Sequence, residues 1–142
     1  MRQPDVHVSA AIEQWLPHRP PFLFVDELRA ASGGGGTCAL RLAADDPRLV
    51  DGRLPPWLVL EALAQSIAAC NGFGKTDGRE EGMLVEIQDA ELQDAARGGE
   101  TVVLCVERRQ SQGALVRFAA HATVGERTQV RALLTVARRG GD

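Results

Sequence analysis

Apolar and polar residues alternate through the second half of the chain and predict four β-strands. The alternating runs are residues 83–87, 101–109, 114–124 and 129–136. Neighbouring side chains of a strand point to opposite faces, so this pattern indicates an antiparallel sheet with one buried face. The apolar residues expected on that face are Met83, Val85, Ile87, Val102, Leu104, Val106, Val116, Phe118, Ala120, Ala122, Val124, Val130, Ala132, Leu134 and Val136.

An apolar segment of another kind, residues 57–71, predicts one long helix. Its large side chains are Leu58, Leu60, Leu63 and Ile67, with alanines between them. Pro56 suits the start of a helix, where a missing N–H is no loss, and Gly72 suits its end. Because the helix is apolar almost all round, we expect the rest of the protein to enclose it.

The first forty residues predict a short helix and a hairpin. Ser9 and the following AAIEQWL indicate a helix that ends at Pro17. Residues 21–31 and 37–42 have the composition of strands, and the run Gly33 to Gly36 separates them. All elements together predict the α+β class, with a curved antiparallel sheet wrapped around one central helix in a single domain, residues 1–142.

Charge and hydropathy exclude several classes of function. The 16 Lys and Arg residues and 19 Asp and Glu residues give a net charge of −3, and the basic residues are scattered apart from Arg138 and Arg139, which we interpret as a solvated tail. This balance gives no reason to expect nucleic acid or an anionic membrane as partner. The chain has no apolar run of signal-peptide or membrane-span length. We therefore expect a cytoplasmic protein without a membrane span.

The three cysteines, Cys38, Cys70 and Cys105, are odd in number and lie far apart among apolar neighbours. This spacing is typical of free thiols in a reducing compartment. His, Cys and Asp residues do not cluster at metal-ligand spacing in the sequence, and we expect no metal and no other cofactor.

Glu61 is unusual within the apolar helix, in the stretch LVLEALAQ. A buried carboxylate is costly unless it is paired or stays protonated. Two interpretations follow from the residues alone. Glu61 is a functional acid with a raised pKa, or it is a structural carboxylate that pairs with an arginine or turns to solvent.

Four stretches resemble the β-hydroxyacyl-acyl carrier protein dehydratases, which have the hotdog fold. LPHRPPFLFVDEL (residues 16–28) resembles their LPHRxPFLxVD opening, and LVLEALAQ (58–65) resembles the LxxEAxAQ of their central helix. GGETV (98–102) and VGERTQVRALLTV (124–136) are similar to a later turn and the closing hairpin. LPPW (54–57), after a loop without histidine, resembles the dehydratase-like proteins of aryl polyene biosynthesis.

The resemblance implies a site with three parts. A loop histidine removes the α-proton, an Asp or Glu on the central helix of the partner subunit protonates the departing hydroxyl, and an N–H at the helix start binds the thioester oxygen. Glu61 falls on the helix acid. Pro47 falls where the histidine should be, and Pro56 falls on the glycine whose N–H is needed. Since proline has no N–H, the amide of Trp57 is the next candidate.

The base is therefore unassigned. His18, in LPHR, is one candidate. The family also has a histidine at this position, but it is not the catalytic one, so the alternative is that His18 is hydrogen-bonded in a structural turn. Asp51 lies in the correct loop, but an Asp before Gly is typical of a turn. We expect His121 on the polar face of its strand and His7 near the terminus, both in solvent.

Three further residues are candidates for binding substrate: Trp57, Pro56 and Gln65. Trp57 either guards the mouth of an acyl tunnel or anchors the helix to the sheet.

Three functions remain open. The first is a dehydratase-like lyase acting on acyl thioesters, carried by acyl carrier protein or CoA, in fatty-acid-like or polyene biosynthesis. The second is a non-catalytic acyl-binding or partner subunit of a heteromeric dehydratase. The third is a hotdog thioesterase, in which the helix carboxylate activates water or attacks the thioester. We expect a homodimer or higher oligomer, or a heteromer with a histidine-bearing homologue, because a single subunit leaves an edge strand open and half a site.

Overall fold

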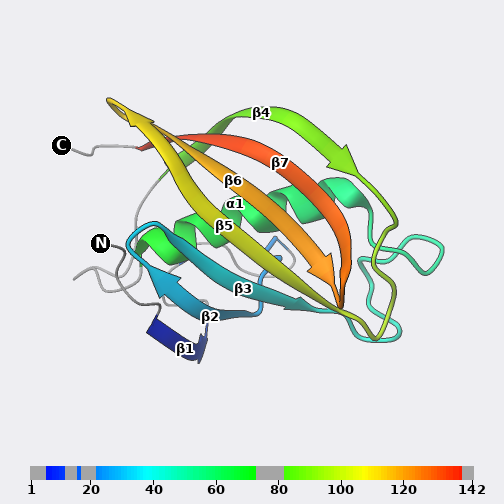
Figure 1. Cartoon of the computed structure of the whole chain (residues 1–142). Coiled ribbons are helices and arrows are strands. Elements are labelled where there is room, and N and C mark those ends of the chain that lie inside the picture. The colour runs from blue at the N-terminus through cyan, green and yellow to red at the C-terminus, as the bar shows by residue number, and fades with distance from the viewer. Residues whose placement is uncertain (1–5, 12–15, 17–21, 73–81, 139–142) are drawn as a thin grey trace.

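The computed structural model describes residues 6–11, 16, 22–72 and 82–138. Within them, seven strands form one antiparallel sheet that curves around a single helix (Figure 1). The elements are β1 (Val6–Ala11), β2 (Glu27–Ser32), β3 (Gly35–Arg41), α1 (Pro56–Gly72), β4 (Gly82–Leu92), β5 (Thr101–Gln112), β6 (Leu115–Val124) and β7 (Arg127–Arg138). The strand order is β1-β2-β3-β5-β6-β7-β4. This architecture confirms the predicted α+β class with one central helix.

The core lies between α1 and the concave face of the sheet. The alternating residues of β5, β6 and β7 point inward as predicted, and Leu104, Phe118 and Leu134 are fully buried against Leu63 and Ile67 of the helix. Burial of these apolar side chains is the main favourable term that holds the helix on the sheet.

The prediction of a buried face is wrong for β4. Met83, Val85 and Ile87 are 61%, 49% and 44% exposed. β4 is an edge strand, since it pairs with β7 on one side and with no other described strand, and two irregularities of register interrupt that pairing. The chain therefore presents a row of large apolar side chains along an open edge, which is unusual for a protein that stays alone.

The predicted N-terminal helix is also wrong where the structure describes it. Ser9, Ala10 and Ala11 belong to β1, which pairs with β2. Sheet pairing outweighs the weak helix preference of this short stretch; residues 12–15 lie outside the described residues. The strand expected from residue 21 pairs with β3 only from Glu27 onward.

The β2–β3 hairpin turns at Gly33 and Gly34, and the next two glycines already belong to β3. Gly36 has no space for a side chain, because a Cβ atom there would lie 2.3 Å from the carbonyl oxygen of Ala30 and 2.7 Å from Sγ of Cys70. The glycine thus lets the end of α1 approach β3 closely.

The cysteines are free, as expected. Cys38 and Cys70 are buried, and the neighbouring Cys38 thiol together with burial raises the pKa of Cys70 well above its usual range. None of the described helices is long and apolar enough to cross a membrane.

Candidate active site

A cavity of about 240 Å³ lies between α1 and strands β4 and β7. On the helix its lining residues are Glu61, Ala64, Gln65, Ile67, Ala68 and Asn71. These positions recur every three or four residues, which places them on one side of a helix. Opposite them lie Met83, Leu84, Val136 and Arg138.

Glu61 stands on a stripe of α1 that the described residues cover only in part. Glu61, Ala64, Ala68 and Asn71 are half-buried, whereas the helix residues between them are mostly buried. The prediction that the protein encloses α1 thus holds for the sheet side only. No cation of the described residues pairs with Glu61. Its carboxyl borders the cavity instead, which leaves it accessible to a ligand.

Gln65 connects Glu61 to the opening motif of the chain. Its side chain is almost fully buried, its Nε2 donates to the carbonyl oxygen of Phe22 at 2.8 Å, and its Oε1 accepts from the N–H of Phe24 at 2.9 Å. The second Nε2 hydrogen reaches the Oε1 atom of Glu61 at 3.4 Å. Both amide hydrogens are therefore engaged, so Gln65 is suited to position Glu61 rather than to donate to a substrate.

The start of α1 lies apart from this cavity. Pro56 is the first helical residue, the N–H of Leu58 donates to the carbonyl oxygen of Pro55 at 3.0 Å, and the first N–H within the helix belongs to Trp57. The Trp57 side chain is 65% exposed, so it does not anchor the helix to the sheet of its own chain. Neither Pro56 nor Trp57 lines the cavity that Glu61 borders.

The loop before α1 is built around a buried carboxylate. Asp46 accepts hydrogen bonds from the backbone N–H of Arg48 at 3.0 Å and from its guanidinium at 2.9 Å. The Arg48 guanidinium lowers the pKa of Asp46 to about 2. Pro47, at the position of the family's histidine, stands between these two residues and is exposed.

Asp51 occupies the tip of a tight turn in the same loop. The N–H of Val50 donates to the carbonyl oxygen of Arg53 at 2.7 Å, and the reverse bond measures 3.1 Å. Asp51 and Gly52 both have positive φ, 51° and 76°, as a two-residue hairpin turn requires. The turn role of Asp51 is thereby supported.

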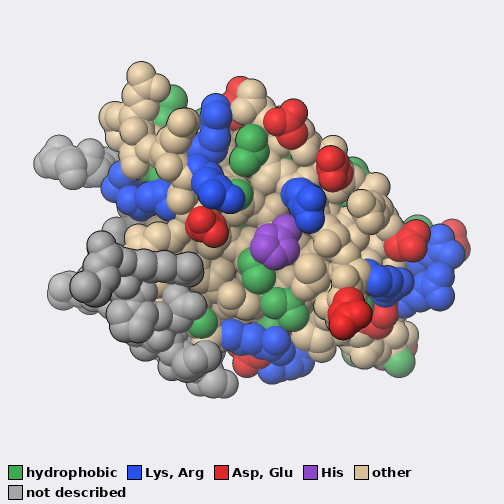
Figure 2. Space-filling view, viewed as in Figure 1, with side chains coloured by type: hydrophobic (Ala, Val, Ile, Leu, Met, Phe, Trp, Pro, Cys, Tyr) green, Lys and Arg blue, Asp and Glu red, His purple; other side chains and the backbone are tan. Residues whose placement is uncertain are grey.

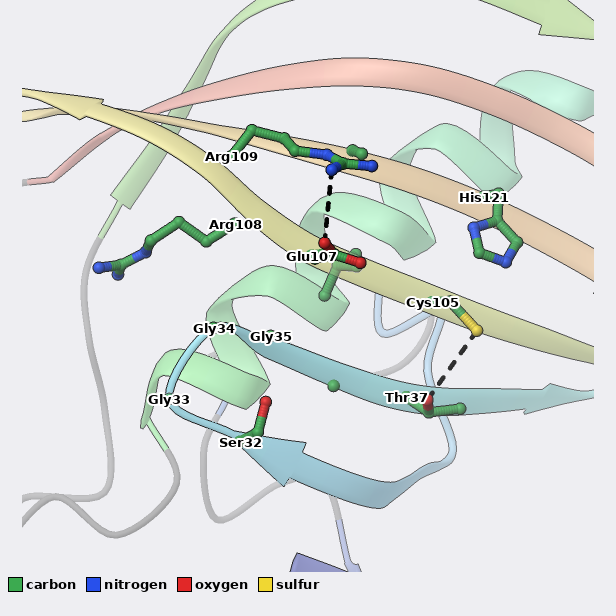
Figure 3. A pocket seen from close by; sticks show the side chains of 13 residues that line it. Ser32, Gly33, Gly34, Gly35, Thr37, Cys105, Glu107, Arg108, Arg109 and His121 are labelled. Carbon is green, nitrogen blue, oxygen red and sulfur yellow. Dashed lines mark hydrogen bonds and ion pairs between the residues drawn. The ribbon is translucent and has the colours of Figure 1, made fainter. Parts of the chain in front are cut away.

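The histidines do not complete the site within the described residues. His18 lies outside the described residues, and the structure does not describe the side chain of His7. His121 is exposed on the outer face of the sheet, where it borders a second cavity of about 550 Å³ together with Cys105, Thr37 and Glu107 (Figure 3). The sheet separates this cavity from Glu61. Charges of both signs are interspersed over the outer face (Figure 2).

Arg138 is the cavity residue that the sequence interpretation missed. It belongs to β7 rather than to a solvated tail, and it continues the inward-facing row of Leu134 and Val136. Extending the alternation of β7 by one step would have placed it on the concave face.

Comparison with known proteins gives consistent results. A family model described as ApeP-like, ApeP dehydratase, matches residues 10–140. The 3-hydroxyacyl-[acyl-carrier-protein] dehydratase FabZ of Blochmanniella floridana is 30% identical over 142 residues, which cover 94% of this chain and 93% of that protein. FabZ of Anaeromyxobacter sp. (strain Fw109-5) is 33% identical over 132 residues, 86% of this chain and 84% of that protein.

Solved structures confirm the predicted hotdog fold. A chain of the dehydratase heterocomplex ApeI:P from Xenorhabdus doucetiae matches with a TM-score of 0.82 at 20% identity, covering 92% of each chain. The E. coli PaaI protein from the phenylacetic acid degradation operon matches with a TM-score of 0.67 at 11% identity, covering 84% of this chain and 82% of that one.

Proposed function

The chain belongs to the ApeP-like dehydratase family, and we propose that it takes part in removing water from 3-hydroxyacyl thioesters. One observation carries this proposal: the Glu61 carboxyl borders a cavity, is not neutralised by any described cation, and is held by Gln65. An acid so placed can reach a substrate that lies along α1.

In the proposed reaction, a base removes a proton from Cα of the acyl chain. The electrons form the Cα–Cβ double bond, and the hydroxyl leaves Cβ with a proton from the Glu61 carboxyl, giving a 2-enoyl thioester and water. Glu61 must be protonated at the start of each turnover. The N–H of Trp57, the first in α1, takes the role of donor to the thioester oxygen.

A second subunit supplies the base in this proposal. The half-buried stripe of α1 and the start of β4 border the same cavity, and a docked subunit would cover both. The ApeI:P structure is described as a heterocomplex of dehydratases. We therefore favour pairing with a histidine-bearing homologue, with an identical subunit as the alternative.

The proposed substrates are acyl thioesters on acyl carrier protein, or on CoA, in a fatty-acid-like or polyene pathway of the cytoplasm. The FabZ relatives are named for acyl-carrier-protein substrates, and this name supports the choice. His18, which the structure does not describe, stays a candidate base.

The proposed function is tested by measuring two products, the hydrated acyl thioester and free thiol, in the same reaction mixture. Purified chain, alone and mixed with a histidine-bearing homologue, is incubated with an enoyl thioester, and both hydration and free thiol are followed. We expect hydration that Glu61→Gln lowers by about 10²-fold or more, the usual contribution of an acid catalyst. Glu126→Gln, at an exposed carboxyl in the turn between β6 and β7, is the matched control.

The other outcomes identify the rival functions. Hydration by the mixture that is unaffected by Glu61→Gln would make this chain a non-catalytic partner. Thiol release without hydration would make it a thioesterase. Either result would overturn the proposed role of Glu61 as a dehydratase acid.

A further inference from the structure

The cavity beside Glu61 changes character along its length. Glu61 stands at one end, and Asn71 lies ten residues further along α1, about 15 Å along the helix axis. The two hydrogen-bonding groups at this far end are Asn71 and Arg138, which lies where β7 ends and pairs in register with Gly82 of β4.

The wall between the two ends is apolar. The side chains that line it are Ala64, Ile67, Ala68, Met83, Leu84 and Val136. Gln65 is the polar exception, and both of its amide hydrogens are engaged. A pantetheine arm carries amides that need hydrogen-bond partners, and this wall does not provide them. A hydrocarbon chain has no polar groups and therefore loses no hydrogen bonds against this wall.

Arg138 is unusual for its position. The inward row of β7 places apolar side chains against the core, and at the last residue an arginine takes the place of one. No carboxylate of the described residues pairs with its guanidinium. A guanidinium that borders a cavity and has no ion partner among the described residues is suited to bind a carboxylate through two parallel hydrogen bonds.

We infer that the cavity takes an acyl chain whose far end carries a carboxylate, bound by Arg138 and Asn71. The inference rests on the proposed function, because the thioester end is placed at Glu61. The axial span of about 15 Å corresponds to an extended chain of roughly twelve carbons, at about 1.2 Å per bond. Arg138 then selects substrates by their terminal group and takes no part in the proton transfers.

Three unreactive probes test this assignment by isothermal titration calorimetry of the assembled protein. In each, nitrogen replaces the thioester sulfur of an acyl pantetheine with a chain of about twelve carbons. The first probe ends in a methyl group and the second in a carboxylate. The third ends in a methyl group and carries a phosphate on the pantetheine hydroxyl.

We expect the carboxylate probe to bind roughly tenfold more tightly than the methyl probe, as a charge-assisted contact provides. Arg138→Met should abolish this preference and Arg138→Lys should retain part of it. Arg109→Met is the control, since Arg109 is exposed on the outer face beside Glu107 and should leave the preference unchanged.

Two results would overturn the inference. One is equal binding of the first two probes by the unmodified protein, a comparison that needs no variant to fold. The other is a preference for the phosphate probe that Arg138→Met removes, which would assign Arg138 to the carrier arm. Hydration of a methyl-ended enoyl thioester is measured separately. If this hydration is retained while the carboxylate preference is absent, this inference fails and the dehydratase role stands.

Discussion

Gln65 and Glu61 form a coupled pair on one side of α1, one turn apart. The same Gln65 amide that reaches Glu61 at 3.4 Å is fixed by the backbone of Phe22 and Phe24 at 2.8 and 2.9 Å. The orientation of the candidate acid is thus set by a segment about forty residues earlier in the chain. Two of the four stretches that resemble the dehydratases, residues 16–28 and 58–65, meet at this amide.

Replacing Gln65 with leucine should lower both stability and activity. The change leaves a carbonyl and an N–H of residues 22–24 without their partner, and each unsatisfied buried group costs on the order of 1–3 kcal/mol. We expect a loss of about 2–4 kcal/mol in the free energy of unfolding, measured with urea. Gln112→Leu, at an exposed side chain, should change it by less than about 0.5 kcal/mol. Equal effects of the two variants would contradict the tethering role.

Gly36→Ala should destabilise the protein, whereas Gly34→Ala should not. An alanine Cβ at Gly36 would overlap the Ala30 carbonyl and the Cys70 thiol, but the same atom at Gly34 meets nothing within 4 Å. Overpacking of this kind costs about 1–3 kcal/mol. Thermal unfolding of both variants tests the difference, and a Gly36→Ala protein as stable as its parent would show that α1 can move away from β3.

The Asp46 carboxyl should make the free energy of unfolding depend on pH. Its pKa is lowered from 3.8 to about 2 in the folded protein, so folding favours the charged form. The stabilisation is present above about pH 4 and is lost as the pH falls toward 2. Asp46→Asn should therefore cost on the order of 1–2 kcal/mol at neutral pH and almost nothing near pH 2.

Urea unfolding of Asp46→Asn and its parent across this pH range measures that difference at a fixed protein concentration. Asp45→Asn, at the exposed neighbouring carboxyl, serves as control. A constant difference between parent and Asp46→Asn at all pH values would contradict the Arg48 pairing as its source.

Val85→Lys should separate subunits without unfolding them. Val85 lies half-exposed on the edge strand β4, so a charge there meets solvent in a single chain but would be buried against a docked partner. We expect light scattering to show a shift toward the monomer mass, while the folded signal in circular dichroism is retained. Leu115→Lys, at a similarly exposed leucine at the start of β6, should leave the mass unchanged. An unchanged mass for Val85→Lys would exclude β4 as the interface.

The periodicity of apolar residues was sufficient to predict the central strands and the helix, but it did not predict the exposure of the edge strand β4. The inward rows of β5, β6 and β7 follow from strict alternation because one face of each strand is buried within the chain. The same alternation in β4 indicates a surface that the described residues leave exposed. A sequence pattern reports that a face is apolar, and it does not say which molecule buries it.

The candidate site was predictable in part. Glu61 was found because a carboxylate stands out in an apolar helix, and the resemblance gave it a role. The tether from Gln65 to residues 22–24 depends on tertiary contact and has no local signal. Arg138 was missed because two adjacent arginines near a chain end have the composition of a tail, although the strand alternation extends to the first of them.

The open edge of β4 also limits how long this subunit can remain single in a cell. An edge strand of eleven residues with exposed apolar side chains is a template for pairing with other unpaired strands, and such random association becomes faster as free chain accumulates. Docking of the correct partner competes with that process from the moment of synthesis. If β4 docks against the proposed partner, balanced production of the two chains keeps this chain soluble, and a cell that overproduces this chain alone should recover it mainly as aggregate.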